Sequence, residues 1–209
     1  MRDVYWIRHA QSTANAGERT DNASEIVLTQ LGVEQARLLA AQFPVRPGLI
    51  VTSPYMRTLL TAKPLMARFE SVPHEIWPVH ELTFLTRGDA KNTTVLERRG
   101  LAGPYWTAMD PYLELGDGGE SFSTFYRRVL ASLTRAAAYR GVGPLVIFTH
   151  TRVLALLVQL VVLPPVDVQE AMGRLYSMAV AGHWEFANAG ILRMGVCEDG
   201  SVQIGAMKV

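Results

Sequence analysis

The sequence predicts an α/β protein, a three-layer sandwich in which a mostly parallel central sheet has helices on both faces. Short runs rich in β-branched and aromatic residues alternate with longer runs of helical periodicity, and this alternation is typical of parallel sheets covered by helices. Apolar residues make up 49% of the 209 residues, enough for one sizeable core. We therefore expect a single domain over residues 1–209, with an inserted lid region at about 82–119.

The sequence predicts six strands and four helices, and one of the helices is strongly apolar. The apolar run 153–163 is too short to span a bilayer and predicts a buried helix. Residues 82–119 interrupt the alternation with glycine, proline, threonine and charge, and we expect them to pass over the carboxyl end of the sheet. The expected strands are 4–7, 49–52, 75–79, 145–148, 183–186 and 191–196. The expected helices run from a cap at Thr29 to about Phe43, from 56 to 68, from about Ser121 with Phe125, Val129, Leu133 and Ala137 at four-residue spacing, and onward from His150.

Composition and charge exclude several classes of partner. The formal net charge is +1, so the chain has no broad basic field for nucleic acid or for membrane lipid. The one cysteine, Cys197, cannot form a disulfide within the chain and favours a reducing compartment. The amino-terminal residues lack the apolar stretch and small-residue cleavage site of a signal peptide. We expect a cytoplasmic protein, and the pattern leaves open whether it forms a homodimer.

The first candidate for chemistry is the segment "RHAQS" at residues 8–12. A β-favouring apolar run ends here in Arg8 and His9, at the carboxyl end of a strand, where open α/β sheets build their sites. An arginine binds phosphoryl oxygens through two hydrogen bonds, and neighbouring cations favour the neutral imidazole with its free lone pair. His9 is therefore a candidate nucleophile toward phosphate. The alternative is a surface loop with an ordinary Arg-His pair.

Two further segments place cations at the same predicted sheet edge. In "TSPYMRTLLTA" a strand ends, Ser53-Pro54 turns the chain, and Arg57 lies in the first turn of a helix whose amino terminus adds donors for an anion. In "VIFTHTRVLALL" His150 follows another buried strand. Each residue taken alone is more often structural, but burying two histidines and two arginines together is costly without an anion. The pattern therefore predicts a phosphate pocket.

Glu81, in "PVHELTF", follows another strand-like run. A bound phosphate repels a carboxylate, so a glutamate beside a phosphate pocket suggests a proton to deliver. The alternative is an ordinary surface glutamate, which is the commoner outcome for a glutamate taken alone. We treat Glu81 as the candidate general acid.

These residues resemble the histidine phosphatase superfamily, which has the phosphoglycerate mutase-like fold. The motifs occur in the family's order and cover almost the whole chain. They comprise Arg8-His9, Leu28-Thr29 with Leu31-Gly32, Ser53-Pro54 with Arg57 and Thr61-Ala62, Glu81, Gly119-Glu120-Ser121 with Arg127, His150 and Asn188. The resemblance implies that His9 is phosphorylated during turnover and that Glu81 is general acid and then base. The residues that it implies for holding the phosphoryl group are Arg8, Arg57 and His150.

Further residues are substrate-binding candidates. The resemblance implies Asn15 as a pocket residue, and Ser12 lies in the same first motif. Thr151 and Arg152 stand where the family usually has a glycine and then a small residue. Thr151 would restrict how closely the backbone approaches a phosphate, and Arg152 either adds a substrate contact or points to solvent. Ala10 replaces the commonest glycine, which is a mild change.

The sequence as a whole predicts a metal-independent phosphomonoester hydrolase that acts on a small phosphorylated metabolite through a phosphohistidine. No metal or other cofactor is expected, because protein cations take that role and no carboxylate cluster is placed to hold Mg²⁺. Phosphoglycerate mutase-type phosphoryl transfer is the first alternative, disfavoured by the modest length of 82–119. A non-catalytic phospho-ligand-binding module would not require His9 and Glu81. A metal protein using His9 and His150 lacks a close third ligand.

Overall fold

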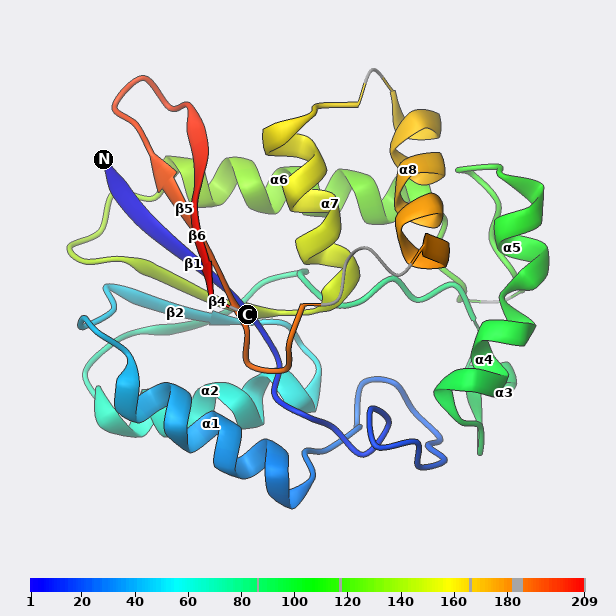
Figure 1. The fold of residues 1–209 in the computed structure, drawn as a ribbon, viewed down its shortest axis with the longest axis horizontal. Helices are drawn as coiled ribbons and strands as arrows, with labels where there is room; N and C mark the ends of the chain where they lie inside the picture. The colour runs from blue at the N-terminus through cyan, green and yellow to red at the C-terminus, as the bar shows by residue number, and fades with distance from the viewer. Residues whose placement is uncertain (86, 117, 166, 182–185, 209) are drawn as a thin grey trace.

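A six-stranded mixed sheet forms the centre of the computed structural model, which describes residues 1–85, 87–116, 118–165, 167–181 and 186–208 (Figure 1). The strands are β1 (Arg2–Arg8), β2 (Leu49–Thr52), β3 (His74–Ile76), β4 (Leu145–Thr149), β5 (Ile191–Val196) and β6 (Val202–Lys208), in the spatial order β3-β2-β4-β1-β5-β6. The first four in this order are parallel; β5 pairs antiparallel with β1, and β6 pairs antiparallel with β5. The predicted fold class is confirmed.

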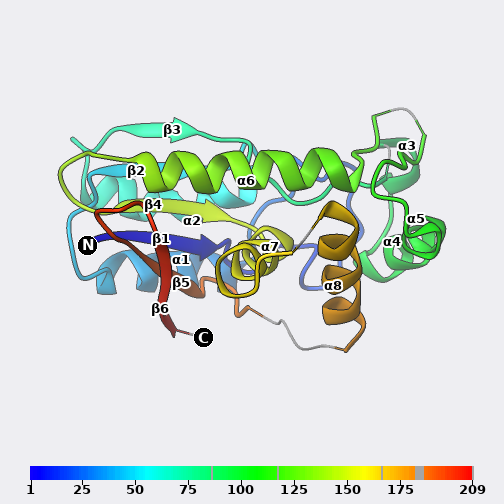
Figure 2. The same cartoon turned by 90° about the horizontal axis from the view of Figure 1, so that it is seen from above.

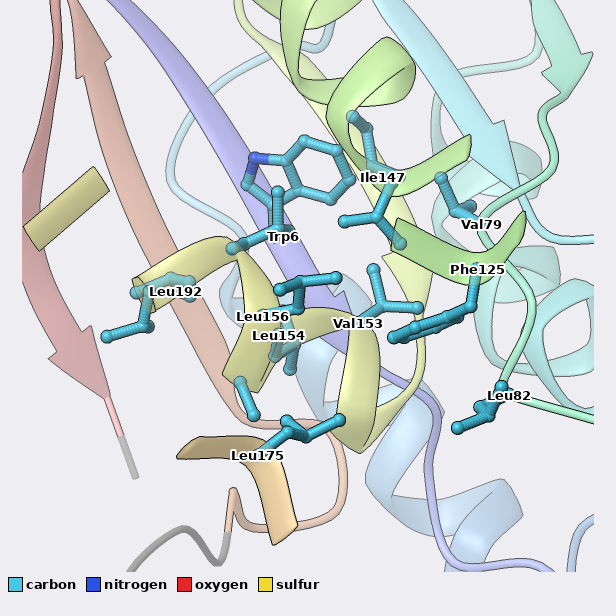
Figure 3. Packing of buried hydrophobic residues seen from close by; sticks show 14 of the residues in the cluster. Trp6, Val79, Leu82, Phe125, Ile147, Val153, Leu154, Leu156, Leu175 and Leu192 are labelled. Atoms are coloured by element: carbon cyan, nitrogen blue, oxygen red, sulfur yellow. The ribbon is translucent and has the colours of Figure 1, made fainter. Parts of the chain in front are cut away.

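Helices cover both faces of the sheet (Figures 1 and 2). One face carries α1 (Gln30–Gln42) and α2 (Met56–Arg68), and the other carries α6 (Phe122–Ala138) and α7 (Thr151–Val162), against which α8 (Val168–Ala181) packs. Successive side chains of β1 point to opposite faces of the sheet, so this strand contributes to the packing on both faces. Tyr5 and Ile7 join the core beneath α1 and α2, whereas Val4 and Trp6 join the larger core beneath α6 and α7. Figure 3 shows Trp6 in that larger cluster with Leu156 of α7.

Several predicted elements are confirmed residue for residue. The predicted elements 49–52, 56–68 and 191–196 match β2, α2 and β5. Thr29 caps α1 as expected, because its side chain accepts a hydrogen bond from the first-turn backbone. Residues 153–159 of α7 are buried, and no helix in the described part of the chain is long and apolar enough to cross a membrane.

Other predictions of secondary structure are wrong. The predicted strand 75–79 ends at Ile76 in the structure, and Pro78 has no N–H with which to continue a ladder. The predicted strand 183–186 is wrong at Phe186, which lies outside the strands, and 183–185 fall outside the described residues. The helix α8 and the strand β6 were not expected at all.

Within the described part of residues 82–119, the chain forms three short helices beyond the carboxyl ends of the parallel strands (Figures 1 and 2). They are α3 (Arg87–Ala90), α4 (Val95–Leu101) and α5 (Gly103–Ala108). Polar contacts join α4 to the loop after β1: Arg98 Nη1 donates to Thr20 Oγ1 at 2.9 Å, and Arg19 pairs with Glu97 at 2.6 Å. The loop after β1 and these helices therefore lie together at the same end of the sheet.

Candidate active site

His9 is the first residue after β1, and only 5% of its surface is exposed. Its backbone N–H donates to Thr149 O of the adjacent strand β4 at 3.0 Å, so the sheet fixes the position of this residue. The ring atom Nδ1 lies 2.8 Å from Ala10 O. A carbonyl oxygen only accepts, so in the neutral ring Nδ1 carries the proton and Nε2 keeps its lone pair. This is the tautomer that a nucleophilic histidine needs.

Burial and two arginines keep the imidazole of His9 neutral. Burial lowers the pKa of His9 well below its ordinary value, and the charges of Arg57 and Arg8 lower it further. Arg8 ends β1, and its Nη1 donates to Phe186 O. The nitrogen lone pair is therefore available at neutral pH, next to cations that favour a bound anion.

His150 follows β4 directly and is fully buried. Its Nδ1 lies 3.0 Å from Arg57 Nη2, and its Nε2 lies 2.8 Å from Ser53 Oγ. A guanidinium only donates, so Nδ1 accepts and Nε2–H donates to Ser53. Burial lowers the pKa of His150 well below its ordinary value, and Arg57 and His9 lower it further. The ring centroids of His9 and His150 are 5.1 Å apart, so the ends of β1 and β4 bring the two imidazoles together.

Arg57 lies in the first turn of α2 and is 6% exposed. Its Nη1 donates to Ala23 O at 2.6 Å, its Nη2 donates to His150, and its Cζ lies 4.9 Å from the ring centroid of Tyr55. Burial lowers the pKa of Arg57 to about 10, against the opposing effect of the Glu81 carboxylate. The guanidinium is therefore still charged at neutral pH, as a buried cation next to the two histidines.

Glu81 lies in the segment that follows β3. Its carboxylate accepts from Leu82 N at 3.1 Å through Oε1 and from Arg152 N at 3.3 Å through Oε2. The Arg152 guanidinium lies 3.9 Å from Glu81 Oε1, and the Glu81 side chain is 20% exposed. The Glu81 carboxylate therefore contacts Arg152 directly, and its charge raises the pKa of Arg57.

Arg128 of α6 holds the segment that carries Glu81. Its Nη1 donates to Pro78 O at 2.8 Å and to His80 O at 2.7 Å, and its Nη2 donates to Glu81 O at 3.3 Å. The same guanidinium binds both carboxylate oxygens of Glu120. The position of the Glu81 backbone is therefore set by a side chain from a different element of the fold.

Arg128 was not identified from the sequence. The resemblance included Arg127, whose Nε instead donates to Ser123 O at 3.2 Å within the same helix. One available signal was the position of Arg128 three residues after Phe125, on a face predicted to be core. A charged residue there needs a partner, but the sequence does not say which.

The candidates Ser12 and Asn15 form a turn beside the backbone of His9. Asn15 Oδ1 accepts from Ser12 N at 3.2 Å and from Ser12 Oγ at 3.0 Å. Asn188 Nδ2 donates both to Asn15 Oδ1 at 3.2 Å and to His9 O at 3.1 Å. Thr151, half-buried, is the first residue of α7. Ser12 and Asn15 thus lie next to the chain of His9, and Thr151 lies next to that of His150.

This arrangement suits a bound anion with a tetrahedral centre. It offers two guanidiniums, two neutral imidazoles, one nitrogen lone pair and one carboxylate, and it lies at the amino-terminal ends of α2 and α7. Within the described ranges, no three histidine, cysteine, aspartate or glutamate side chains lie together in a way that could hold a metal ion. The site can bind a phosphoryl group, attack it with nitrogen and exchange a proton.

Solved structures of known proteins share this fold. The α-ribazole phosphatase from Shigella flexneri is 22% identical, with a TM-score of 0.72 over 98% of this chain and 95% of that chain. The mycobacterial glucosyl-3-phosphoglycerate phosphatase is 24% identical, with a TM-score of 0.68 over 100% and 98%. The phosphoserine phosphatase from Entamoeba histolytica is 17% identical, with a TM-score of 0.66 over 100% and 98%. At these identities the likeness shows a shared fold.

The family follows from the sequence itself. No curated protein sequence matches the chain. The model of the histidine phosphatase superfamily (branch 1), however, matches residues 4–182, which include the segments around His9, Arg57, Glu81 and His150. The chain therefore belongs to the histidine phosphatase superfamily and is a phosphatase/mutase-like enzyme.

Proposed function

We propose that this enzyme is a metal-independent phosphomonoester hydrolase that acts on a small phosphorylated metabolite through a phosphohistidine at His9. The observation that carries the proposal is the state of His9, a buried neutral imidazole whose Nδ1 donates to Ala10 O and whose Nε2 keeps a lone pair. The charges of Arg57 and Arg8 beside the ring support binding of an anionic phosphoryl group.

In the first step, His9 Nε2 attacks phosphorus while the bond from phosphorus to the ester oxygen breaks. The guanidiniums of Arg8 and Arg57 balance charge on the other phosphoryl oxygens, and the neutral imidazole of His150 is the third group proposed to hold them. Positioning and electrostatic stabilisation dominate this kind of transfer. Glu81 enters this step protonated and gives that proton to the departing ester oxygen, so the alcohol leaves neutral and Glu81 becomes the carboxylate that the second step uses.

In the second step, water replaces the alcohol. The Glu81 carboxylate takes a proton from water, the oxygen of that water attacks phosphorus, and the bond from phosphorus to Nε2 breaks. The electron pair of that bond returns to Nε2, which restores neutral His9. Inorganic phosphate then leaves.

Phosphoryl transfer back to the same substrate, as in a mutase, is the second candidate. That reaction must exclude water from the phosphohistidine, whereas hydrolysis must admit it. The side chains of Glu81 and Arg152 are 20% and 30% exposed, so water reaches the position of the proposed base. This favours the hydrolase.

The first experiment tests the nucleophile. His9→Ala should abolish hydrolysis of phosphate esters while circular dichroism and the melting temperature stay close to those of the parent. Rapid quenching of the parent with ³²P-labelled substrate should trap label that is stable to base and labile to acid, as phosphohistidine is. Acid-stable label on Ser12 would overturn the mechanism.

The proposal includes metal independence and a cytoplasmic location. Activity should survive exhaustive chelation, because protein cations neutralise the phosphoryl group; loss in chelator that Mg²⁺ or Zn²⁺ restores would contradict this. The cytoplasm is proposed because the single cysteine, Cys197, cannot form a disulfide within one chain.

A further inference from the structure

Arg152 lies beside the proposed general acid. Its backbone N–H donates to Glu81 Oε2 at 3.3 Å, and its Nη1 lies 3.9 Å from Glu81 Oε1. In the proposed function, Glu81 gives its proton to the ester oxygen. The part of the leaving alcohol next to that oxygen is therefore close to the Arg152 guanidinium.

The Arg152 guanidinium contacts Phe84 and Glu81 and remains accessible to solvent. Its Cζ lies 5.2 Å from the ring centroid of Phe84, and its Nη1 lies 3.9 Å from Glu81 Oε1. The side chain is 30% exposed. Stacking on an aromatic ring fixes the plane of a guanidinium while its edge stays available for hydrogen bonds. A fixed planar edge matches a carboxylate bidentately.

The charge balance of the first step changes around Arg152. Before reaction, the Glu81 carboxylate partly neutralises the guanidinium at 3.9 Å. To act as general acid, Glu81 takes up a proton from solvent before the ester bond breaks, so in the reactive complex it is uncharged and Arg152 has lost that compensation. A second anion on the substrate would restore it, because an opposite charge next to a partly desolvated guanidinium is favourable.

We propose that Arg152 is a specificity-determining residue that binds a carboxylate on the leaving group, so that the enzyme prefers phosphate esters of hydroxy acids. This inference rests on the proposed function, because it takes the ester oxygen to lie at Glu81. It goes further by assigning the substrate class to a named side chain, at the position directly after Thr151 in α7.

The test compares substrates that differ only in the carboxylate. One pair is 3-phosphoglycerate and glycerol 3-phosphate, and the other is O-phosphoserine and O-phosphoethanolamine. Each pair shares a poor alkoxide leaving group, so an indirect effect of Arg152 on Glu81 changes both members alike. p-Nitrophenyl phosphate reports whether the phosphate site itself works.

The parent should show a higher kcat/KM for the carboxylate member of each pair. Arg152→Gln should lower kcat/KM for that member by about 10- to 100-fold, the range for a hydrogen bond to a charged group. Any loss that acts through Glu81 is shared by both members, so the ratio of kcat/KM within each pair should itself fall by about 10- to 100-fold. Arg152→Lys should recover part of the preference, because lysine keeps the positive charge but cannot bind a carboxylate through two parallel hydrogen bonds. Arg99→Gln removes an exposed arginine on α4 and controls for net charge.

Two results would overturn the inference in distinguishable ways. If the parent cleaves p-nitrophenyl phosphate but treats both members of each pair alike, or if Arg152→Gln lowers both members equally, the carboxylate assignment is wrong and the hydrolase proposal stands. If the parent cleaves none of the five esters, the proposed function falls and the inference falls with it.

Discussion

Arg128 binds Glu120 through two parallel hydrogen bonds, from Nε to Oε1 at 2.6 Å and from Nη2 to Oε2 at 2.8 Å, with both side chains about 10% exposed. Glu120 in turn holds the chain at Thr83, where Thr83 N donates to Oε2 at 3.3 Å. Removing one partner of such a buried pair leaves an uncompensated charge, which typically costs 3–5 kcal/mol. The pair therefore fixes both ends of the short segment around Glu81.

Glu81→Gln should slow the phosphorylation step strongly only when the leaving group needs a proton. An alkoxide leaves poorly without protonation, whereas p-nitrophenolate leaves well. General acid catalysis is worth about 10²- to 10⁴-fold, so we expect a loss of that order with alkyl phosphates and a much smaller one with p-nitrophenyl phosphate. Single-turnover or burst kinetics must be used, because hydrolysis of the phosphohistidine also uses Glu81. Equal losses with both substrates would mean that Glu81 positions substrate, and the acid would then be sought at His80 or Glu120.

Arg128→Lys should reproduce a weaker form of the same leaving-group dependence. A lysine cannot bind Glu120 and three carbonyls at once, so the Glu81 backbone shifts. Misplacement by about 1 Å costs up to about 10²-fold, and we expect about 10- to 100-fold in phosphorylation by alkyl phosphates and a smaller loss with p-nitrophenyl phosphate. The control is Arg135→Lys on the same helix, where Arg135 pairs with Glu75 at 2.7 Å and both side chains are about half exposed. A lowered melting temperature with unchanged leaving-group dependence would leave Arg128 a purely structural role.

Stability should fall as the pH is lowered from about 6.5. Burial is the main cause that lowers the pKa of His9 and His150 well below the ordinary value and that of His80 to about 4. In the unfolded chain these side chains take up protons near pH 6.5. The unfolded state then binds more protons than the folded state, so the free energy of unfolding decreases between about pH 6.5 and 4.

Urea unfolding at pH 7.5, 6.0 and 5.0 in phosphate-free buffer measures this trend. His80→Gln should make the decrease shallower, because it removes one histidine of lowered pKa and leaves the two strand-end histidines in place. A free energy of unfolding that is constant or rising from pH 7.5 to 5.0 would show that these histidines are protonated in the folded protein.

Gly32→Ala should disturb the loop that follows His9. A Cβ atom at Gly32 would lie 2.0 Å from the backbone oxygen of Gln11, so α1 or the loop must move. Overpacking of this kind typically costs 1–3 kcal/mol, and a displaced loop should also lower kcat. The control is Gly100→Ala in α4, where no atom lies within 4 Å of the added Cβ. Denaturant unfolding and kcat measurements test this prediction. If Gly32→Ala changes neither the free energy of unfolding nor kcat, the loop can move away from α1 at little energetic cost.

Strong local patterns account for what could be predicted of the fold. The run 49–52 is apolar up to Thr52 and is followed by a clear Ser53-Pro54 turn, so the end of this strand and the start of the helix 56–68 are visible in the sequence. In contrast, β6 contains Gly205 and alternates weakly, and its pairing with β5 is a long-range choice that local periodicity does not encode. The antiparallel pairing of β5 with β1 is a long-range choice of the same kind, although the bounds of β5 itself were predicted.

The functional site likewise contains residues that could be predicted from the sequence and contacts that could not. His9, Arg57 and His150 each follow a predicted strand, and strand order brings them together, so their proximity was inferable from the end positions of the strands. The contacts of Arg128 were not inferable, because they go to backbone carbonyls about 50 positions away. Every residue has a backbone carbonyl, so the sequence does not indicate which carbonyls accept these bonds. The hydroxyl of Ser53 as the partner of His150 was likewise hidden behind its turn-forming role.

The pairing of β1 with β4 ties the site to the order in which the chain folds. Trp6 lies opposite Ile147, so a loop of about 140 residues must close before the two histidines meet, and such non-local pairing is slow. The anion site consequently exists only in molecules that have completed the sheet. A ligand that binds only those molecules stabilises them, by about 2.7 kcal/mol at a hundredfold excess over its Kd. A higher cellular concentration of the phosphate ester should thus protect more of the protein from proteolysis, in addition to raising the rate of catalysis.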